Sequence, residues 1–289
     1  MGGLEGPPKP PTEARGAPAK PWHPSIPGHR RAPKPPMAAR GAPGEAVAPL
    51  DSGTARRSRS TPRFRGRFAV VALSILMMDP VRAAFDRIAE QYAADFADEL
   101  ARKPWDVERL RRFAAACPPG PVLDVGCGAA GHIGCFLAEL DTRADRPVIG
   151  VDFSERSAAL ARRLNPALSF VAGDVGALPF AGGACAGILA FYSLIYAGDE
   201  ATAALLAELR RVLRDGGRLL AAVHAGTGAQ RFTEYKGAAI DVELHPRRPQ
   251  VFAAQVRQAG FVVEAVEVRP PYAFEHATER LYLAARASS

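Results

Sequence analysis

The chain has 289 residues, of which 48% are apolar and 23% charged, a composition typical of one large or two small globular domains. Its net charge of +7 comes from residues 1–67, which carry 13 Lys and Arg against 4 Asp and Glu, so the other 222 residues sum to −2. Because this segment also holds 14 of the 26 prolines, we expect residues 1–77 to be a disordered extension and residues 78–289 to be the folded domain. Disorder of the whole chain is excluded, and the basicity belongs to the extension.

The cysteines and the longest apolar run argue against metal sites and membrane spans. None of the four cysteines has CxxC spacing or a nearby His pair, which predicts reduced thiols and no metal site; they are Cys117, Cys127, Cys135 and Cys185. The apolar run at residues 68–78 is shorter than the ~20 residues of a spanning helix. We expect a cytoplasmic protein, with an internal signal-like segment as an alternative. A further hypothesis places the native start at Met77 or Met78.

The folded part opens with two predicted helices. Asp79 is a suitable N-cap and Pro80 a suitable first helical residue, so we expect the first helix to begin there. Its apolar side chains recur every three or four residues, at Val81, Phe85, Ile88, Tyr92, Phe96 and Leu100. A second helix is predicted for residues 105–117, because the sequence Pro-Pro-Gly follows at 118–120.

From residue 121 on, strands and helices alternate with short connections. Strands are predicted at residues 121–125, 148–151, 168–172, 187–191 and 218–224, and helices at 132–140, 154–164 and 200–213, with Ser154 as an N-cap. This alternation is typical of an α/β doubly wound, Rossmann-like fold with helices on both faces of a parallel sheet. After a helix at 250–259, strands at 261–268 and 281–285 follow without a helix between them, which predicts an antiparallel pair at the sheet edge.

A glycine-rich turn follows the first strand. Glycines at 126, 128 and 131 remove side chains where a ligand can approach the backbone, and the next helix offers free N–H groups at its start. Asp152 ends the second strand, about 28 residues after Asp124, where a carboxylate is placed to accept both hydroxyls of a ribose. Taken alone, these features fit a nicotinamide dinucleotide site equally well.

Three further features disfavour a nicotinamide-dependent oxidoreductase. Asp124 precedes the first glycine by two residues, where its carboxylate would repel a pyrophosphate and attract a cationic ligand. Asp174, after the third strand, can accept a hydrogen bond from the amine of adenine, while the Val175 amide donates to a ring nitrogen. The third feature is the order of strand, residues 191–194, helix, the Asp-Gly-Gly turn at 215–217, and strand.

With these motifs the sequence resembles the class I S-adenosylmethionine-dependent methyltransferases, in particular the small-molecule enzymes similar to the ubiquinone and menaquinone methyltransferases. The resemblance covers roughly residues 79–288 and rests on DVGCG at 124–128, GVDFS at 150–154, GDVGALPF at 173–180 and LRRVLRDGG at 209–217. It implies a seven-stranded sheet whose last strand is antiparallel. It also implies that S-adenosylmethionine binds at the carboxyl ends of the first four strands.

The resemblance further implies roles for single residues in cofactor binding. Around the methionine part and the ribose it places Gly126, Gly128, Asp124 at the ammonium end, and Asp152 on the ribose. Around the adenine and the sulfonium it places Phe153 against the ring, Asp174 and Val175 at the ring edge, Ala190 and Phe191 beside the sulfonium, and Tyr92 closing over the cofactor. One departure is that Ala129 and Ala130 widen the usual Gly-x-Gly-x-Gly turn before Gly131.

The expected reaction is methyl transfer to a small organic acceptor by direct displacement, which requires positioning above all. Where the acceptor carries a proton, His224 and Tyr192 are candidate bases, and Tyr196, Tyr235 and His276 are further candidates for the acceptor pocket. The alternatives are a nucleic-acid-associated protein acting through its basic extension, and an oxidoreductase. For the folded domain we expect no nucleic acid, membrane or metal, and the sequence identifies neither the acceptor nor the oligomeric state.

Overall fold

The computed structural model describes residues 65–140 and 145–289, with the backbone alone for residues 65–78. The helices are α1 (Arg65–Phe96), α2 (Pro104–Ala116), α3 (His132–Leu140), α4 (Glu155–Leu164), α5 (Asp199–Val212) and α6 (Pro249–Gln258), with the 3-10 turns η1 (Glu99–Arg102) and η2 (Leu194–Tyr196). The strands are β1 (Val122–Val125), β2 (Val148–Asp152), β3 (Ser169–Ala172), β4 (Cys185–Phe191), β5 (Leu213–Ala225), β6 (Gln230–Tyr235), β7 (Ala238–Leu244), β8 (Phe261–Arg269) and β9 (Glu279–Ala287).

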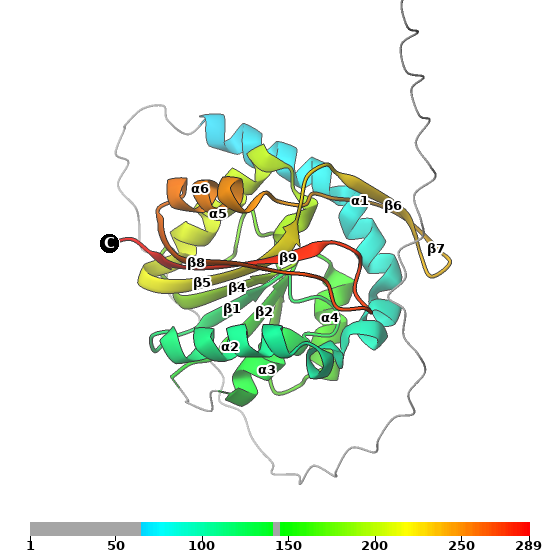
Figure 1. The fold of residues 1–289 in the computed structure, drawn as a ribbon, viewed down its shortest axis with the longest axis horizontal. Coiled ribbons are helices and arrows are strands. Elements are labelled where there is room, and N and C mark those ends of the chain that lie inside the picture. The colour runs from blue at the N-terminus through cyan, green and yellow to red at the C-terminus, as the bar shows by residue number, and fades with distance from the viewer. Residues whose placement is uncertain (1–64, 141–144) are drawn as a thin grey trace, which may run out of the picture.

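Seven strands form one sheet in the order β3-β2-β1-β4-β5-β9-β8 (Figure 1). Strands β1 to β5 pair in parallel, whereas β9 is antiparallel to both β5 and β8. The structure therefore confirms the predicted α/β fold with its antiparallel last strand. It also confirms the predicted antiparallel pair at the edge, because β8 joins the sheet only through β9.

Helices cover both faces of this sheet (Figure 1). On one face α5 and α6 pack through side chains that include Leu206, Leu209 and Phe252, all fully buried. On the other face α2 and α3 pack through Leu110 and Leu137, which are fully buried as well. Removal of this apolar surface from water is the main favourable term that holds the three layers together.

The parallel register brings the functional ends of the strands to one edge of the sheet. Val125 at the end of β1 lies opposite Val151 of β2, and Asp152 at the end of β2 lies opposite Ala172 at the end of β3. The loops that follow β1, β2, β3 and β4 therefore meet at this edge, where open α/β sheets bind their ligands.

Several predicted boundaries agree with the structure. Ser154 caps α4, because its Oγ accepts a hydrogen bond of 2.9 Å from the backbone N–H of Ser157. Helix α3 occupies the predicted residues 132–140. Strand β5, in contrast, begins at Leu213 rather than at the predicted Arg218, because the strand includes the Asp-Gly-Gly sequence at 215–217.

The first helix begins earlier than predicted. Helix α1 runs unbroken from Arg65 through Pro80 to Phe96, so the predicted start at Asp79 is wrong, and the expected boundary between residues 77 and 78 lies inside a helix. Pro80 removes one backbone hydrogen bond, but its fixed φ is compatible with a helix, and the flanking Ala, Leu and Met residues favour that conformation. The disorder predicted for residues 1–64 lies outside the described residues. Over the part that is described, no helix has the length and hydropathy needed to cross a membrane.

The sequence analysis did not predict the β6–β7 hairpin, which lies between β5 and α6 along the chain. Its two-residue turn consists of Lys236 and Gly237, whose φ angles of 48° and 85° are both left-handed. The hairpin packs beside α1 (Figure 1). Two polar contacts join them: Arg87 donates to the carbonyl of Ala239, and Asp95 pairs with Lys236 at 2.5 Å. The hairpin and α1 together form the wall that faces the carboxyl edge of the sheet.

Candidate active site

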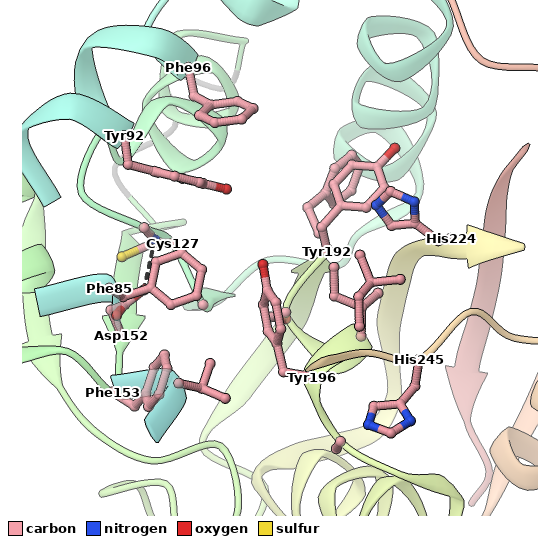
Figure 2. A pocket seen from close by; sticks show the side chains of 18 of the residues that line it. Phe85, Tyr92, Phe96, Cys127, Asp152, Phe153, Tyr192, Tyr196, His224 and His245 are labelled. Atoms are coloured by element: carbon pink, nitrogen blue, oxygen red, sulfur yellow. Dashed lines mark hydrogen bonds between the residues drawn. The ribbon is translucent and has the colours of Figure 1, made fainter. Parts of the chain in front are cut away.

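A cavity of about 500 Å³ opens at the carboxyl edge of β1, β2 and β4. One side is lined by the turn after β1 and by the ends of β2 and β3, and the other by residues after β4, β5 and β8. Figure 2 shows aromatic rings of α1, among them Phe85 and Tyr92, across the cavity from Tyr192 and His224. We call the side lined by the turn after β1 and the ends of β2 and β3 the nucleotide side. We call the side lined by residues after β4, β5 and β8 the acceptor side.

The glycine-rich turn has the conformation that glycine allows. Gly126 and Gly128 line the cavity with φ angles of 74° and 63°, where a side chain would strain the backbone. Gly131 has a φ of 60°, but it does not line the cavity, and a Cβ there would stand 2.8 Å from the ring of Phe170. Gly131 is therefore needed for packing. The turn widened by Ala129 and Ala130 still places Gly126 and Gly128 at the cavity.

Asp152 faces the cavity with its carboxylate held in place by the backbone. Oδ2 accepts a hydrogen bond of 2.8 Å from the N–H of Gly128, and Oδ1 accepts one of 2.9 Å from the N–H of Ser154. Burial raises the pKa of this carboxyl to about 6 in spite of both donors. A carboxylate has further lone pairs, so it can accept two ligand hydroxyls in addition.

Asp124 and His132 form a second polar group on the nucleotide side. Asp124 is 1% exposed, and its Oδ2 accepts a hydrogen bond of 2.9 Å from the N–H of Gly134 in the first turn of α3. Burial raises its pKa to about 6 although His132 favours the charged form. His132 Nε2 contacts Glu99 Oε1 at 2.8 Å, while Nδ1 is buried without a partner among the described residues. His132 was not among the predicted site residues, and the signal that could have found it is its place as the first residue of α3.

The remaining predicted nucleotide residues lie together at the ends of β2 and β3. Phe153 contacts Phe85 of α1 edge-to-face, with ring centroids 6.1 Å apart. Asp174 Oδ1 accepts a hydrogen bond of 2.7 Å from Gly176, while Oδ2 stands 3.8 Å from Arg82 Nη2. Val175 lines the cavity beside them. The structure thus brings these side chains to one wall, as the sequence motif predicts.

Tyr92 closes the same wall from the side of α1. A Cβ on Gly128 would lie 3.7 Å from its ring, so the helix lies directly over the glycine turn. Its ring contacts those of Phe85 and Phe96, with centroid distances of 5.4 and 4.2 Å. Burial raises the pKa of Tyr92 well above its usual value, which keeps the hydroxyl protonated.

Ala190 and Phe191 face opposite ways at the end of β4. Phe191 lines the cavity, whereas Ala190 is fully buried in the core beneath α5 and does not reach the cavity. Successive side chains of a strand point to opposite faces, so only one of the two can face the site. The expectation that both residues flank the sulfonium therefore fits Phe191 alone.

On the acceptor side, Tyr192 has a φ of 55°, which residues other than glycine rarely adopt. Its backbone N–H donates to the carbonyl of Ala222 at 2.7 Å, and its hydroxyl lies 3.2 Å from that of Tyr282. Burial raises the pKa of Tyr192, so its hydroxyl stays protonated at neutral pH. This favours a donor or wall-forming role over that of a base.

The other predicted acceptor residues divide into two groups. His224, Tyr196 and His276 line the cavity, and His224 Nδ1 lies 2.5 Å from Thr278 Oγ1. Tyr235 does not line it, because its hydroxyl turns to Asp95 of α1 at 2.5 Å. Tyr235 thus holds the β6–β7 hairpin to α1.

A buried charge network supports the acceptor side. Lys103 Nζ lies 2.6 Å from Glu99 Oε2 and 3.3 Å from Glu275 Oε1. Arg269 pairs with Glu275 at 2.6 Å and with Asp106 at 3.2 Å. Burial opposes ionisation of both glutamates, but the surrounding hydrogen bonds and cations hold the pKa of each at about 2. The network fixes η1 and the segment before β9 against each other.

Comparison with known proteins agrees with this geometry. Residues 122–217 match a family described as a methyltransferase domain. This match and the order of the seven-stranded sheet support a class I S-adenosylmethionine-dependent methyltransferase domain. The matched residues of the methyltransferase domain run from β1 into β5, so they include the nucleotide side and end before His224.

One curated relative and two solved structures extend the comparison of the methyltransferase domain. The chain is 32% identical over 164 residues to a demethylmenaquinone methyltransferase of Renibacterium salmoninarum, which covers 54% of this chain and 65% of that protein. A DhpI complex with SAH superposes with a TM-score of 0.57 at 20% identity, covering 73% of this chain and 97% of that one. The 1,6-didemethyltoxoflavin-N1-methyltransferase of Burkholderia thailandensis gives a TM-score of 0.51 at 21% identity, with 80% and 94% covered. The two structures share the fold, and the chain spans less than two thirds of the curated relative.

Proposed function

We propose that this protein transfers a methyl group from S-adenosylmethionine to a small organic acceptor bound in the cavity. The observation that carries the proposal is Asp152, whose two oxygens are fixed by the amides of Gly128 and Ser154 at the end of β2. A carboxylate held in this way beside a glycine turn is suited to the two hydroxyls of a ribose. The expected cofactor residues from β1, β2 and β3 that line the cavity lie on the same side as Asp152: Asp124, Gly126, Gly128, Phe153, Asp174 and Val175.

The polar atoms of the cavity fit such a cofactor. His132 Nδ1 and Ser193 Oγ are buried at the cavity and have no hydrogen-bond partner among the described residues, a cost that a polar ligand removes. We assign the methionine end to Asp124, Gly126, Gly128 and His132, the ribose to Asp152, and the adenine to Phe153, Asp174 and Val175. The bound cofactor supplies a methyl group already activated on a sulfonium sulfur. The chain's own residues have to orient the acceptor and exclude water.

The aromatic lining of the acceptor side is suited to a small, flat molecule. Phe96, Tyr192 and Tyr196 present aromatic surface to the cavity (Figure 2), and the β6–β7 hairpin packs beside α1. The curated relative named above is a demethylmenaquinone methyltransferase, which supports a ring-containing small molecule as the acceptor of this chain. Neither the nucleic-acid alternative nor the oxidoreductase alternative finds support in these relatives.

Isothermal titration of the full-length chain tests the proposal. S-adenosylmethionine and S-adenosylhomocysteine should bind with dissociation constants in the micromolar range, on the order of −8 kcal/mol. NAD⁺ and NADH are the controls and should give no heat of binding. A chain that shows native circular dichroism and binds neither sulfur compound would refute the proposal.

A further inference from the structure

His224 occupies the end of β5 on the acceptor side and has one of its two ring nitrogens already committed. The residue is 8% exposed and lines the cavity, and its Nδ1 lies 2.5 Å from Oγ1 of Thr278. Figure 2 shows its ring beside Tyr192, and the two rings stand edge-to-face with centroids 5.5 Å apart. Nε2 is therefore the ring nitrogen that can form a hydrogen bond with a molecule in the cavity.

Arg280 determines which of the two atoms in this contact carries the proton. Arg280 Nη1 donates to Oγ1 of Thr278 at 2.7 Å and also donates to the carbonyl of that residue. A hydroxyl that already accepts from a guanidinium has its own proton free to donate, and Nδ1 of His224 is the acceptor within reach. If Nδ1 carried the proton instead, the Thr278 hydroxyl proton would have no acceptor among the described residues.

The groups around the ring keep it neutral. Arg280 lies opposite His224 on β9, and His276 lies on the segment that leads into that strand. Lys103 approaches from between η1 and α2, and Glu275 is the acid that opposes these groups. Burial, together with the positive charge of Arg280, holds the pKa of His224 well below its usual value. The neutral ring with an unprotonated Nδ1 then carries its one proton on Nε2.

We propose that His224 donates a hydrogen bond from Nε2–H to an oxygen of the methyl acceptor, and so acts as a specificity-determining residue rather than as a base. The acceptor class that this donor selects is a flat aromatic molecule with a carbonyl oxygen or an ionised hydroxyl. That oxygen is adjacent to the methylated atom rather than being that atom, because a donor on the attacking lone pair would reduce its reactivity. The assignment of the acceptor rests on the proposed function, whereas the proton position on His224 does not.

Nitrogen-15 NMR of the full-length chain labelled at histidine tests the proton position. We expect His224 to show a protonated Nε2 and an unprotonated Nδ1 at pH 7, and to remain neutral at pH 6.5, where an ordinary histidine is half imidazolium. The His224→Gln variant assigns the signals. In Thr278→Val, which keeps the side-chain shape and removes the hydroxyl, an Nδ1–H fraction should appear. A wild-type His224 with the proton on Nδ1, or an imidazolium at pH 7, would overturn the proposal.

A matched pair of probes tests the contact with oxygen. 1-Indanone and indane differ by one carbonyl oxygen, and both are small enough for the cavity. In the presence of S-adenosylhomocysteine, 1-indanone should move the Nε2 signal of His224 and bind at least threefold more tightly than indane, and His224→Phe should remove that difference. Equal effects of the two probes on wild-type Nε2 would refute the oxygen contact. Failure of the proposed function appears separately, as absence of S-adenosylhomocysteine binding.

Discussion

Gly126 lies so close to Ser193 that a Cβ on the glycine would stand 2.3 Å from the Cβ of the serine. The turn after β1 and the turn after β4 are therefore in direct contact beneath the cavity. Ser193 follows Tyr192, whose left-handed backbone directs the chain into this contact. One of these turns lines the nucleotide side and the other lines the acceptor side, so the shapes of the two sides depend on each other.

This contact makes Gly126→Ala a sharp test of the turn. A left-handed φ costs alanine about 1–2 kcal/mol wherever it occurs, and overpacking against Ser193 adds about 1–3 kcal/mol. Gly216→Ala is the control, because Gly216 has a similar φ of 72° with no atom near its Cβ position. We expect a larger loss of stability in urea for Gly126→Ala than for the control. We also expect at least tenfold weaker binding of S-adenosylhomocysteine, and equal effects of the two variants would contradict the fitted contact.

Two of the carboxylates on the nucleotide side, Asp152 and Asp174, should differ in how much they contribute to cofactor affinity. Asp152→Ala removes two charge-assisted hydrogen bonds to a ribose, worth about 1.5–3 kcal/mol each, so S-adenosylhomocysteine should bind at least tenfold more weakly. Asp174→Ala removes one contact to a neutral amine and should cost less. Calorimetry measures both, with the exposed Asp215→Ala as a control that leaves affinity unchanged. An unaltered affinity in Asp152→Ala would disprove the ribose assignment.

Cofactor affinity should decline in mildly acidic solution. Burial raises the pKa of both Asp124 and Asp152 to about 6, so each carboxyl is ionised above that pH and takes up a proton below it. Because the charged form is the one that holds an ammonium or two hydroxyls, S-adenosylhomocysteine should bind about tenfold more weakly at pH 5 than at pH 7.5. Calorimetric titrations across this range measure the effect, which should be smaller in Asp152→Ala. A flat profile for the wild type would show that neither ionisation matters for binding.

Arg247 should be a stability determinant of the acceptor side. Its guanidinium is buried, pairs with Asp199 at 2.7 Å, donates to Thr202 at 2.7 Å and caps carbonyls of the η2 turn. Arg247→Ala leaves these acceptors unpaired and should lower the free energy of unfolding by about 3 kcal/mol. Urea denaturation measures this loss against the exposed Arg257→Ala, which should change stability by less than about 0.5 kcal/mol. Similar values for the two variants would contradict the proposed role.

The sheet and the nucleotide side were predictable because their signals are local. Short apolar strands, the glycine turn and the Ser154 cap each depend on a few neighbouring residues. Helix α1 was predicted too short. Proline favours the first turn of a helix, but the helix-forming residues before Pro80 extend this helix in the N-terminal direction. The β6–β7 hairpin was missed because only three residues of its strands are buried, and its turn places Lys236 rather than asparagine at a left-handed φ.

The acceptor side could not be predicted to the same depth. The pairs Lys103–Glu275 and Arg269–Asp106 join residues far apart in the chain, and no periodicity or spacing relates them. At the end of β4, periodicity shows that Ala190 and Phe191 face opposite sides but not which side holds the cavity. The proton on His224 depends on Arg280 and Thr278, whose contact with β5 exists only once the sheet has formed.

The place of β9 between β5 and β8 also orders the events of biosynthesis. β8 leaves the ribosome before β9, yet β9 is its partner in the sheet and its link to β5. The glycine turn, Asp152 and Asp174, in contrast, are encoded between β1 and β4 and are translated before β8 and β9. A nascent chain therefore carries β1 to β5 before Thr278 and Arg280 are translated, and the histidine at the end of β5 acquires these partners only after β8 has been synthesised.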